Sequence, residues 1–244
     1  MSKMNNENSF QFSAIGKVNS CYKEKFGIPR QSLLVNSPGQ IEIFADYSNN
    51  DAFRELEKFS HIWVIFVFSE TQNQGWNPTV RPPRLGGNKR IGVFASRSMF
   101  RPNPVGLSVV ELKSIERSGD NIILNINGGD FLDSTPVLDI KPYVPYADSI
   151  PSANAAYANS KPLDKLLVNF SAGAMNDIHL NELQYPGLAQ LIVEILQMDP
   201  RPAYQDKRKE IKSEYAMKLY DFDIKWKIEK DQILVEKLYK RVNP

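Results

Sequence analysis

Short apolar stretches, rich in β-branched and aromatic residues and separated by turn-forming residues, dominate the chain up to about residue 160. Such a pattern predicts many short strands and little helix, which is typical of a barrel or a sandwich rather than of an alternating parallel sheet. Residues 64–68 are apolar throughout, so we expect a strand that is buried on both faces. Further strands are expected at residues 10–18, 41–44, 91–95, 107–115, 122–126 and 137–140, and one short helix with an Asn or Asp cap at residues 51–59.

The pattern changes after Pro162. Residues 165–172 predict a strand, and residues 186–198 predict an amphipathic helix with proline in its first turn and Asp199-Pro200 at its end. Polar and apolar residues alternate in residues 220–228, which with residues 233–238 predict an antiparallel hairpin. We therefore expect a mainly β, α+β chain with two domains, residues 1–162 forming the strand-rich one and residues 163–244 a small α+β domain.

Composition excludes several classes of protein. The lone cysteine, Cys21, permits no intrachain disulfide, and His61 and His179 are the only histidines, so no metal-ligand spacing and no histidine-dependent hydrolase is expected. The glycines Gly86, Gly87 and Gly92 match neither a dinucleotide-binding fingerprint nor a phosphate-binding Walker loop. No apolar run approaches a membrane span or a signal peptide, so we expect a cytoplasmic protein without a membrane or metal partner.

Charge is distributed unevenly along the chain. The net charge of +2 is small for a nucleic-acid binder, yet residues 71–110 contain no Asp or Glu. The cations of this segment are Arg81, Arg84, Lys89, Arg90, Arg97 and Arg101. They can form a positive surface for phosphates, or they can be scattered solvated charges, and the sequence leaves both interpretations open.

Three segments are candidates for chemistry. Residues 79–108 combine arginines with prolines and glycines, which predicts rigid loops suited to an anionic ligand, although tight turns between strands remain an alternative. The segment Asp199-Pro200-Arg201-Pro202-Ala203-Tyr204 either presents Asp199, Arg201 and Tyr204 together or simply ends a helix. The same uncertainty attaches to Asp139, in Asp139-Ile140-Lys141-Pro142-Tyr143 at the end of a strand.

The order of these motifs resembles the TrmO family of tRNA N6-adenosine methyltransferases, over about residues 10–226. The matching segments are Tyr22-Lys23-Glu24-Lys25-Phe26, Pro29-Arg30-Gln31, Arg81-Pro82-Pro83-Arg84-Leu85-Gly86-Gly87, Gly92-Val93-Phe94-Ala95, Arg97-Ser98, Phe100-Arg101-Pro102-Asn103-Pro104, Gly106-Leu107-Ser108, Thr135-Pro136, and the segments beginning at Asp139 and Asp199. The resemblance implies a β-barrel methyltransferase domain that binds S-adenosyl-L-methionine, a smaller C-terminal domain and a homodimer. It implies N6-threonylcarbamoyladenosine at position 37 of threonine tRNA, in the anticodon loop, as the substrate.

The resemblance also implies the residues that contact the cofactor. They are Pro29, Arg30, Gln31, Ser69, Glu70, Arg97, Leu107, Asn127, Gly128, Gly129 and Asp130.

The expected chemistry needs further groups. The acceptor nitrogen belongs to a urea-like group, so a general base should assist, and Asp139, Asp199 and Tyr204 are the candidates. Arg201 or Arg101 can pair with the threonyl carboxylate. Phosphates of the anticodon stem can meet Arg84, Lys89 and Arg90, and Tyr204 or Phe100 can stack on a loop base. A non-catalytic RNA-binding module, a methyltransferase of the same fold with another substrate, and a purely structural β protein remain alternatives.

Overall fold

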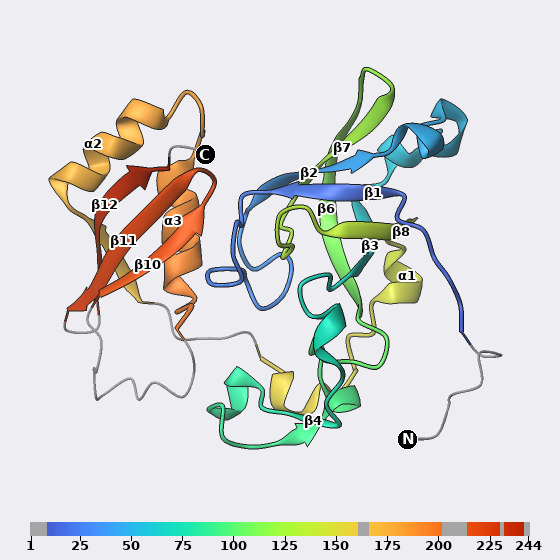
Figure 1. Cartoon of the computed structure of the whole chain (residues 1–244), viewed down its shortest axis with the longest axis horizontal. Helices are drawn as coiled ribbons and strands as arrows, with labels where there is room; N and C mark the ends of the chain where they lie inside the picture. Colours follow the sequence, from blue (N-terminus) through green and yellow to red (C-terminus); the bar gives the residue numbers. More distant parts are fainter. Residues whose placement is uncertain (1–8, 161–165, 202–213, 230–231, 242–244) are drawn as a thin grey trace.

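The computed structural model describes residues 9–160, 166–201, 214–229 and 232–241. Most of the first part is a closed antiparallel barrel in the strand order β1-β2-β7-β6-β3-β8 (Figure 1). The strands are β1 (Gly16–Ser20), β2 (Pro38–Ile43), β3 (His61–Val67), β6 (Val105–Ser118), β7 (Asn121–Asn127) and β8 (Pro136–Pro142). The contact between β1 and β8 closes the barrel, with Gly16 opposite Val137. The predicted strand-rich barrel is confirmed.

Strand β3 shows why the barrel strands form. Ile62, Val64 and Phe66 point into the core and are buried, whereas Trp63 and Val67 on the outer face are partly exposed. The prediction of a strand buried on both faces was therefore wrong. The outer residues are apolar for another reason, since Trp63 and Val67 line a cavity on the outside of the barrel.

Several expected elements differ from those observed. Residues 51–59 form two 3-10 turns, Asn50–Phe53 and Leu56–Lys58, because Glu55 between them adopts a left-handed conformation with φ of 71°. The expected cap is present, as the Asn49 side chain accepts a hydrogen bond of 2.9 Å from the Asp51 amide. The strand expected at 91–95 is only β5 (Ile91–Gly92), which pairs with β4 (Thr79–Val80) and is followed by a 3-10 turn at Val93–Ala95. The strand expected from residue 10 begins only at Gly16.

The second part is a sheet in the order β10-β11-β12-β9, with two helices packed against it (Figure 1). Its strands are β9 (Leu167–Phe170), β10 (Glu214–Leu219), β11 (Phe222–Glu229) and β12 (Gln232–Lys240), and its helices are α2 (Ala172–Asn181) and α3 (Leu188–Gln197). The short helix α1 (Pro145–Asp148) precedes it in the chain. The predicted helix and hairpin are confirmed, whereas α2 and β10 were not predicted.

The two parts share a boundary that is not a simple linker. Cys21, Tyr22 and Val35, from the first part, belong to the apolar core of the second. The Tyr220 amide donates to the Cys21 carbonyl at 2.7 Å, and the Lys218 amide donates to Glu24 Oε1 at 2.8 Å. The segment after β1 therefore covers the edge of β10. The expected domain boundary at residues 162/163 lies outside the described residues and stays a prediction.

Within the described ranges, no helix combines the length and apolar character that crossing a membrane requires. The same part of the chain holds no group of three or more His, Cys, Asp or Glu side chains arranged to bind a metal ion.

Candidate active site

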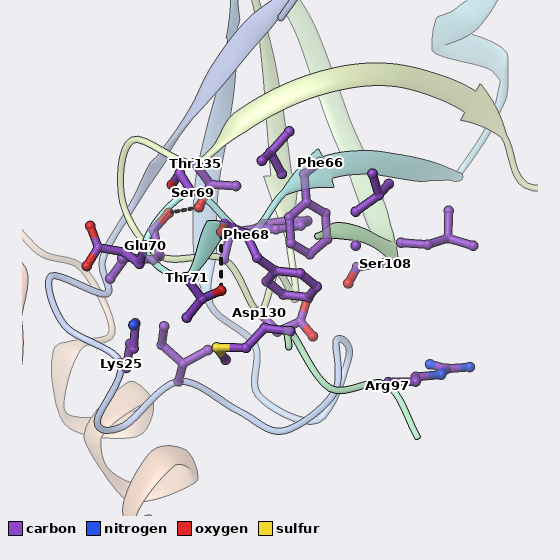
Figure 2. Close-up of a pocket in the computed structure, with 18 of the residues that line it drawn as sticks. Lys25, Phe66, Phe68, Ser69, Glu70, Thr71, Arg97, Ser108, Asp130 and Thr135 are labelled. Atoms are coloured by element: carbon purple, nitrogen blue, oxygen red, sulfur yellow. Dashed lines mark hydrogen bonds between the residues drawn. The ribbon is translucent and has the colours of Figure 1, made fainter. Parts of the chain in front are cut away.

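A cavity of about 500 Å³ lies beside β3 and β6, within the size range of small-molecule sites (Figure 2). Its lining takes in outward residues of these strands, such as Trp63 and Leu107, and inward ones, such as Phe66 and Ser108. The loops after β1 and β3, the segment 96–101 and the turn after β7 complete its wall. The lining residues are Lys25, Ile28, Pro29, Arg30, Gln31, Trp63, Phe66, Val67, Phe68, Ser69, Glu70, Thr71, Ser96, Arg97, Met99, Arg101, Val105, Gly106, Leu107, Ser108, Asp130, Phe131, Leu132 and Thr135. Aromatic and aliphatic side chains alternate here with charged ones, as in sites for amphipathic small molecules.

The structure gathers most of the residues that the family resemblance pointed to. Those that line the cavity are Pro29, Arg30, Gln31, Ser69, Glu70, Arg97, Leu107 and Asp130. They come from segments up to about a hundred residues apart in the chain, and folding brings them to one wall. Their contact with a cofactor stays a prediction.

Asn127, Gly128 and Gly129 do not line the cavity but build the turn beside it. Gly128 has a φ of +78°, and its carbonyl accepts a 2.8 Å hydrogen bond from the Leu33 amide. A side chain at Gly129 would meet the ring of Phe131 at 2.8 Å. These glycines therefore allow the chain to turn tightly and bring Asp130, the next residue, into the cavity.

Asp130 is the most unusual ionisable group of the cavity. Burial raises its pKa, although Ser108 and the nearby charge of Arg97 oppose that effect. Its Oδ1 atom is buried and has no hydrogen-bond partner among the described residues. Because an unpaired buried acceptor costs free energy, a ligand that donates a hydrogen bond to it would be favoured.

Two arginines hold the loop that carries residues 96–101. Arg97 Nη1 donates to Gln31 Oε1 at 2.6 Å, so it joins the segment 96–101 to the loop after β1. Arg101 Nη1 donates to the carbonyls of Ser96 at 2.7 Å and Val93 at 3.2 Å. The Arg101 guanidinium, one of the two expected to pair with the threonyl carboxylate, thus stabilises the shape of the loop.

Opposite charges stand together at one end of the cavity. Lys25 and Glu70 both lie there, and Figure 2 shows the Lys25 ammonium and the Glu70 carboxylate at the same end. An adjoining hollow is also bordered by these two residues, together with Lys23 and Asp133, whose side chains form a 2.8 Å ion pair. This end of the cavity can therefore accept a group that carries both charges.

Asp199 and Arg201 form a buried pair near the cavity. Arg201 Nε donates to Asp199 Oδ1 at 2.8 Å, and its Nη2 donates to Oδ2 at 3.1 Å. Burial acts to lower the pKa of the guanidinium, but Asp199 and Tyr215 outweigh it and leave that pKa above its ordinary value. The structure commits both groups to each other. Tyr204, the third residue of this predicted set, lies outside the described residues.

Arg30 connects this pair to the cavity. Burial lowers the pKa of the Arg30 guanidinium, the charge of Asp199 opposes this, and the charge of Arg84 adds to it. Arg30 therefore has Asp199 and Arg84 as its charged neighbours, and it lines the cavity as well.

Asp139 is placed elsewhere. It lies on β8 opposite Ile65, its Oδ2 is 2.7 Å from Lys141 Nζ, and its side chain is 45% exposed. It is not among the residues that line the cavity. The geometry therefore gives no support to Asp139 as the base.

Several cavity residues escaped the sequence analysis. Phe68 and Met99 line the wall but belong to none of the segments that carry the family resemblance. The one signal that could have found a part of this wall is the apolar outer face of β3, where Trp63 and Val67 had no structural reason to be apolar.

The closed barrel, the cavity beside it and the small α+β sheet define a two-part barrel protein with a site for a small molecule. The chain belongs to the tRNA-methyltransferase O family: the family's N-terminal domain matches residues 17–149 and its C-terminal domain residues 164–241. An Escherichia coli protein named tRNA (adenine(37)-N6)-methyltransferase is 51% identical over 90% of this chain and 94% of its own length. A Pseudomonas aeruginosa protein named putative S-adenosylmethionine-dependent methyltransferase RcsF is 42% identical, over 88% and 90%.

Solved structures agree with this assignment. A crystal structure of TrmO from Pseudomonas aeruginosa superimposes with a TM-score of 0.77 at 33% identity, covering 95% of this chain and 98% of that one. A second structure of TrmO has a TM-score of 0.78 at 35% identity, with 94% and 99% covered. The barrel and the small C-terminal sheet are thus features of the family.

Proposed function

We propose that this chain is an S-adenosylmethionine-dependent methyltransferase that methylates N6 of adenosine 37 in tRNA. The observation that carries the proposal is the 51% identity to the E. coli tRNA (adenine(37)-N6)-methyltransferase over nearly the full length of both chains. The cavity supports it independently, because residues from both flanking loops and from β6 converge on a site that fits this cofactor.

The cavity residues match the parts of S-adenosylmethionine. The unpaired Oδ1 of Asp130 is an acceptor for a hydroxyl or amine hydrogen. Phe66, Phe68 and Leu107 offer apolar surface to an adenine ring. Lys25 and Glu70 provide opposite charges for a carboxylate and an ammonium group. When bound, the cofactor supplies an activated methyl group.

The residues of the chain orient and shield the reaction. Hydrogen bonds from Arg97 and Arg101 fix the loop that forms one wall of the cavity, so little conformational entropy is lost when a ligand binds. Among the described candidates for the base, Asp199 is held by Arg201, so it can take up a proton only after that pair opens. Tyr204, which lies outside the described residues, remains a candidate from the sequence.

The finer assignment is N6-threonylcarbamoyladenosine in threonine tRNA, methylated by a cytoplasmic homodimer. The threonyl carboxylate calls for a cation, and the structure favours Arg30 over Arg201 and Arg101, since those two are hydrogen-bonded within the chain. The expected dimer is supported by Val105 on β6, which is 40% exposed and would be covered by a second copy.

The proposal is tested by nucleoside mass spectrometry of tRNA from cells that lack the protein. The methyl group on threonylcarbamoyladenosine should disappear and return when the gene is restored. Titration of S-adenosylmethionine into the pure protein separates the alternatives. A non-catalytic RNA-binding module would bind tRNA without the cofactor, and a methyltransferase with another substrate would bind the cofactor while the tRNA nucleosides stayed unchanged.

A further inference from the structure

Hydrogen bonds from the side chains of Arg101, Ser96 and Tyr157 hold the 3-10 turn Val93–Ala95 in place. The Arg101 guanidinium bonds to the carbonyls of Val93 and Ser96, and the Ser96 hydroxyl donates to the Val93 carbonyl at 2.8 Å. From outside, the Tyr157 hydroxyl donates to the Ala95 carbonyl at 3.3 Å. The Val93 side chain is buried, so the turn is also anchored from within.

This rigid turn holds a large aromatic side chain in solvent. Phe94 is 73% exposed, while its neighbour Val93 is 1% exposed. The Arg101 guanidinium carbon lies 5.5 Å from the centre of the Phe94 ring. Exposing a phenyl ring forgoes the free energy of burying it, so a fixed and exposed ring is suited to a partner that covers it.

The position of Phe94 connects it to the proposed reaction. Ser96, Arg97 and Arg101, the next residues of the same loop, line the cavity. Phe94 therefore stands at the rim of the cavity, on the loop that carries its wall. A group bound against Phe94 would lie beside whatever enters the cavity.

The charge around Phe94 indicates the kind of partner. Residues 71–110 contain no acidic residue, and their cations are Arg81, Arg84, Lys89, Arg90, Arg97 and Arg101. In the part of the chain that the structure describes, none of these cations forms an ion pair. Cations without an ion-pair partner, on the same chain segment as an exposed aromatic ring, are a combination that binds single-stranded nucleic acid, with phosphates on the cations and bases on the ring.

We propose that Phe94, backed by Arg101, is a stacking platform for an unpaired base of the anticodon loop next to the methylated adenosine. The inference rests on the proposed function and assigns a substrate contact within it. A stacked neighbouring base would fix the position of the loop, so the target adenosine reaches the cavity in one orientation.

A second copy of the chain is the competing occupant of this ring. In a two-fold interface centred on Phe94 both copies contribute the same patch, so Arg101 and the other cations of this segment would be brought close to those of the second copy. Such like-charge contacts disfavour association, whereas the same cations favour RNA. Phe100, one of the two aromatics expected from the sequence to stack, is half-buried, and its carbonyl accepts from the Asn77 amide at 3.2 Å. Tyr204, the other, lies outside the described residues.

The test compares Phe94→Ala, Phe94→Leu and Phe94→Trp with the wild type. The probe is an anticodon stem-loop RNA of threonine tRNA with 2-aminopurine placed at one loop position at a time, next to position 37. Wild-type protein and Phe94→Trp should quench the fluorescence of one neighbour of position 37. Phe94→Ala and Phe94→Leu should not, and both should bind the RNA roughly five- to hundredfold more weakly. Leucine keeps most of the apolar area of phenylalanine but has no ring. Loss of quenching and affinity in Phe94→Leu would therefore show that stacking, and not apolar burial alone, binds the base.

Controls separate the possible failures. Phe12→Ala removes a ring that is 72% exposed and does not line the cavity, and it should bind RNA as the wild type does. Affinity for S-adenosylmethionine should be unchanged in every Phe94 variant. The inference is overturned if Phe94→Ala quenches and binds like the wild type, or if sedimentation shows that it changes oligomeric state while RNA affinity is kept. If the wild type itself transfers no methyl group to tRNA, the proposed function fails, which is a separate result.

Discussion

Arg201 and Asp199 form a two-pronged ion pair across a single intervening proline, with both side chains at most 10% exposed. Asp199 follows the last turn of α3, adopts a left-handed conformation with φ of +50°, and donates its amide to the Leu196 carbonyl at 3.0 Å. Asp tolerates this conformation better than most residues because its short polar side chain can bond locally. The helix end and the ion pair therefore depend on the same residue.

Breaking this ion pair should lower both the stability of the protein and its turnover on tRNA. Asp199→Ala leaves Arg201 buried without a counter-charge and should lower the free energy of unfolding by about 3–5 kcal/mol, measured by urea denaturation. Arg201→Ala should do the same, because it leaves the Asp199 carboxylate buried without its counter-charge, and it should abolish turnover on modified tRNA because Asp199 is a candidate base. The double variant should cost clearly less than the sum of the two, because it leaves no unpaired charge. Additive losses would show that the pair is not coupled.

Asp130 should strengthen ligand binding and lower the stability of the ligand-free protein. Asp130→Asn keeps the shape but removes the buried charge, so affinity for S-adenosylmethionine should fall about tenfold or more, measured by calorimetry. The ligand-free variant should be more stable than the wild type wherever Asp130 is ionised in the wild type.

The sign of this stability effect follows from the raised pKa of Asp130. The folded protein holds this proton more tightly than the unfolded chain does, so its stability falls as the pH rises through the raised pKa. The advantage of Asp130→Asn should therefore be present above that pKa and vanish on acidification. An advantage that grows in acid would contradict the assignment.

Arg97 and Arg90 should affect different ligands. Arg97 lines the cavity and bonds to Gln31, so Arg97→Ala should weaken binding of the methyl donor. Arg90 is exposed, lies outside the cavity and donates to Thr79 at 3.3 Å, so Arg90→Ala should leave donor binding intact. It should instead lower the salt dependence of tRNA binding by about one counterion, measured as the slope of log affinity against log salt. Equal effects of both variants on the donor would refute this division.

Gly106 makes the wall of the cavity possible. A Cβ atom at this position would overlap the ring of Phe66, so Gly106→Ala must displace that ring. We expect a loss of about 1–3 kcal/mol in stability, seen in thermal melts, and weaker donor binding. Gly92→Ala is the matched control, since a Cβ atom at that position would meet nothing within 4 Å beyond its chain neighbours, and its effect should be small. A melting temperature of Gly106→Ala equal to that of the wild type would show that the Phe66 ring can move aside without cost.

The sequence was informative where periodicity and burial coincide. The alternating residues of β11 and the apolar stripe of α3 predicted both elements, because each buries one regular face. Helix α2 was missed because it buries only Ala174 and Ile178, which give no stripe, and its cap at Ser171 follows a strand directly. The break at Glu55 was missed because its left-handed conformation is imposed by the surrounding structure.

The site was predictable only in part, for a similar reason. Arg97, Gln31 and Asp130 were named from motif resemblance, but their contacts depend on chain reversals that no local pattern specifies. The sequence also could not distinguish an arginine that serves a ligand from one that serves the fold. Arg101 and Arg201 were both expected to meet the substrate, and both bond to groups of their own chain.

The most direct test of the account is a crystal structure with S-adenosylhomocysteine, the demethylated donor. This ligand should occupy the cavity lined by β3 and β6, with a donor group hydrogen-bonded to Asp130 Oδ1 and its amino acid end between Lys25 and Glu70. A ligand bound elsewhere, with Asp130 still unpaired and the cavity empty, would contradict it.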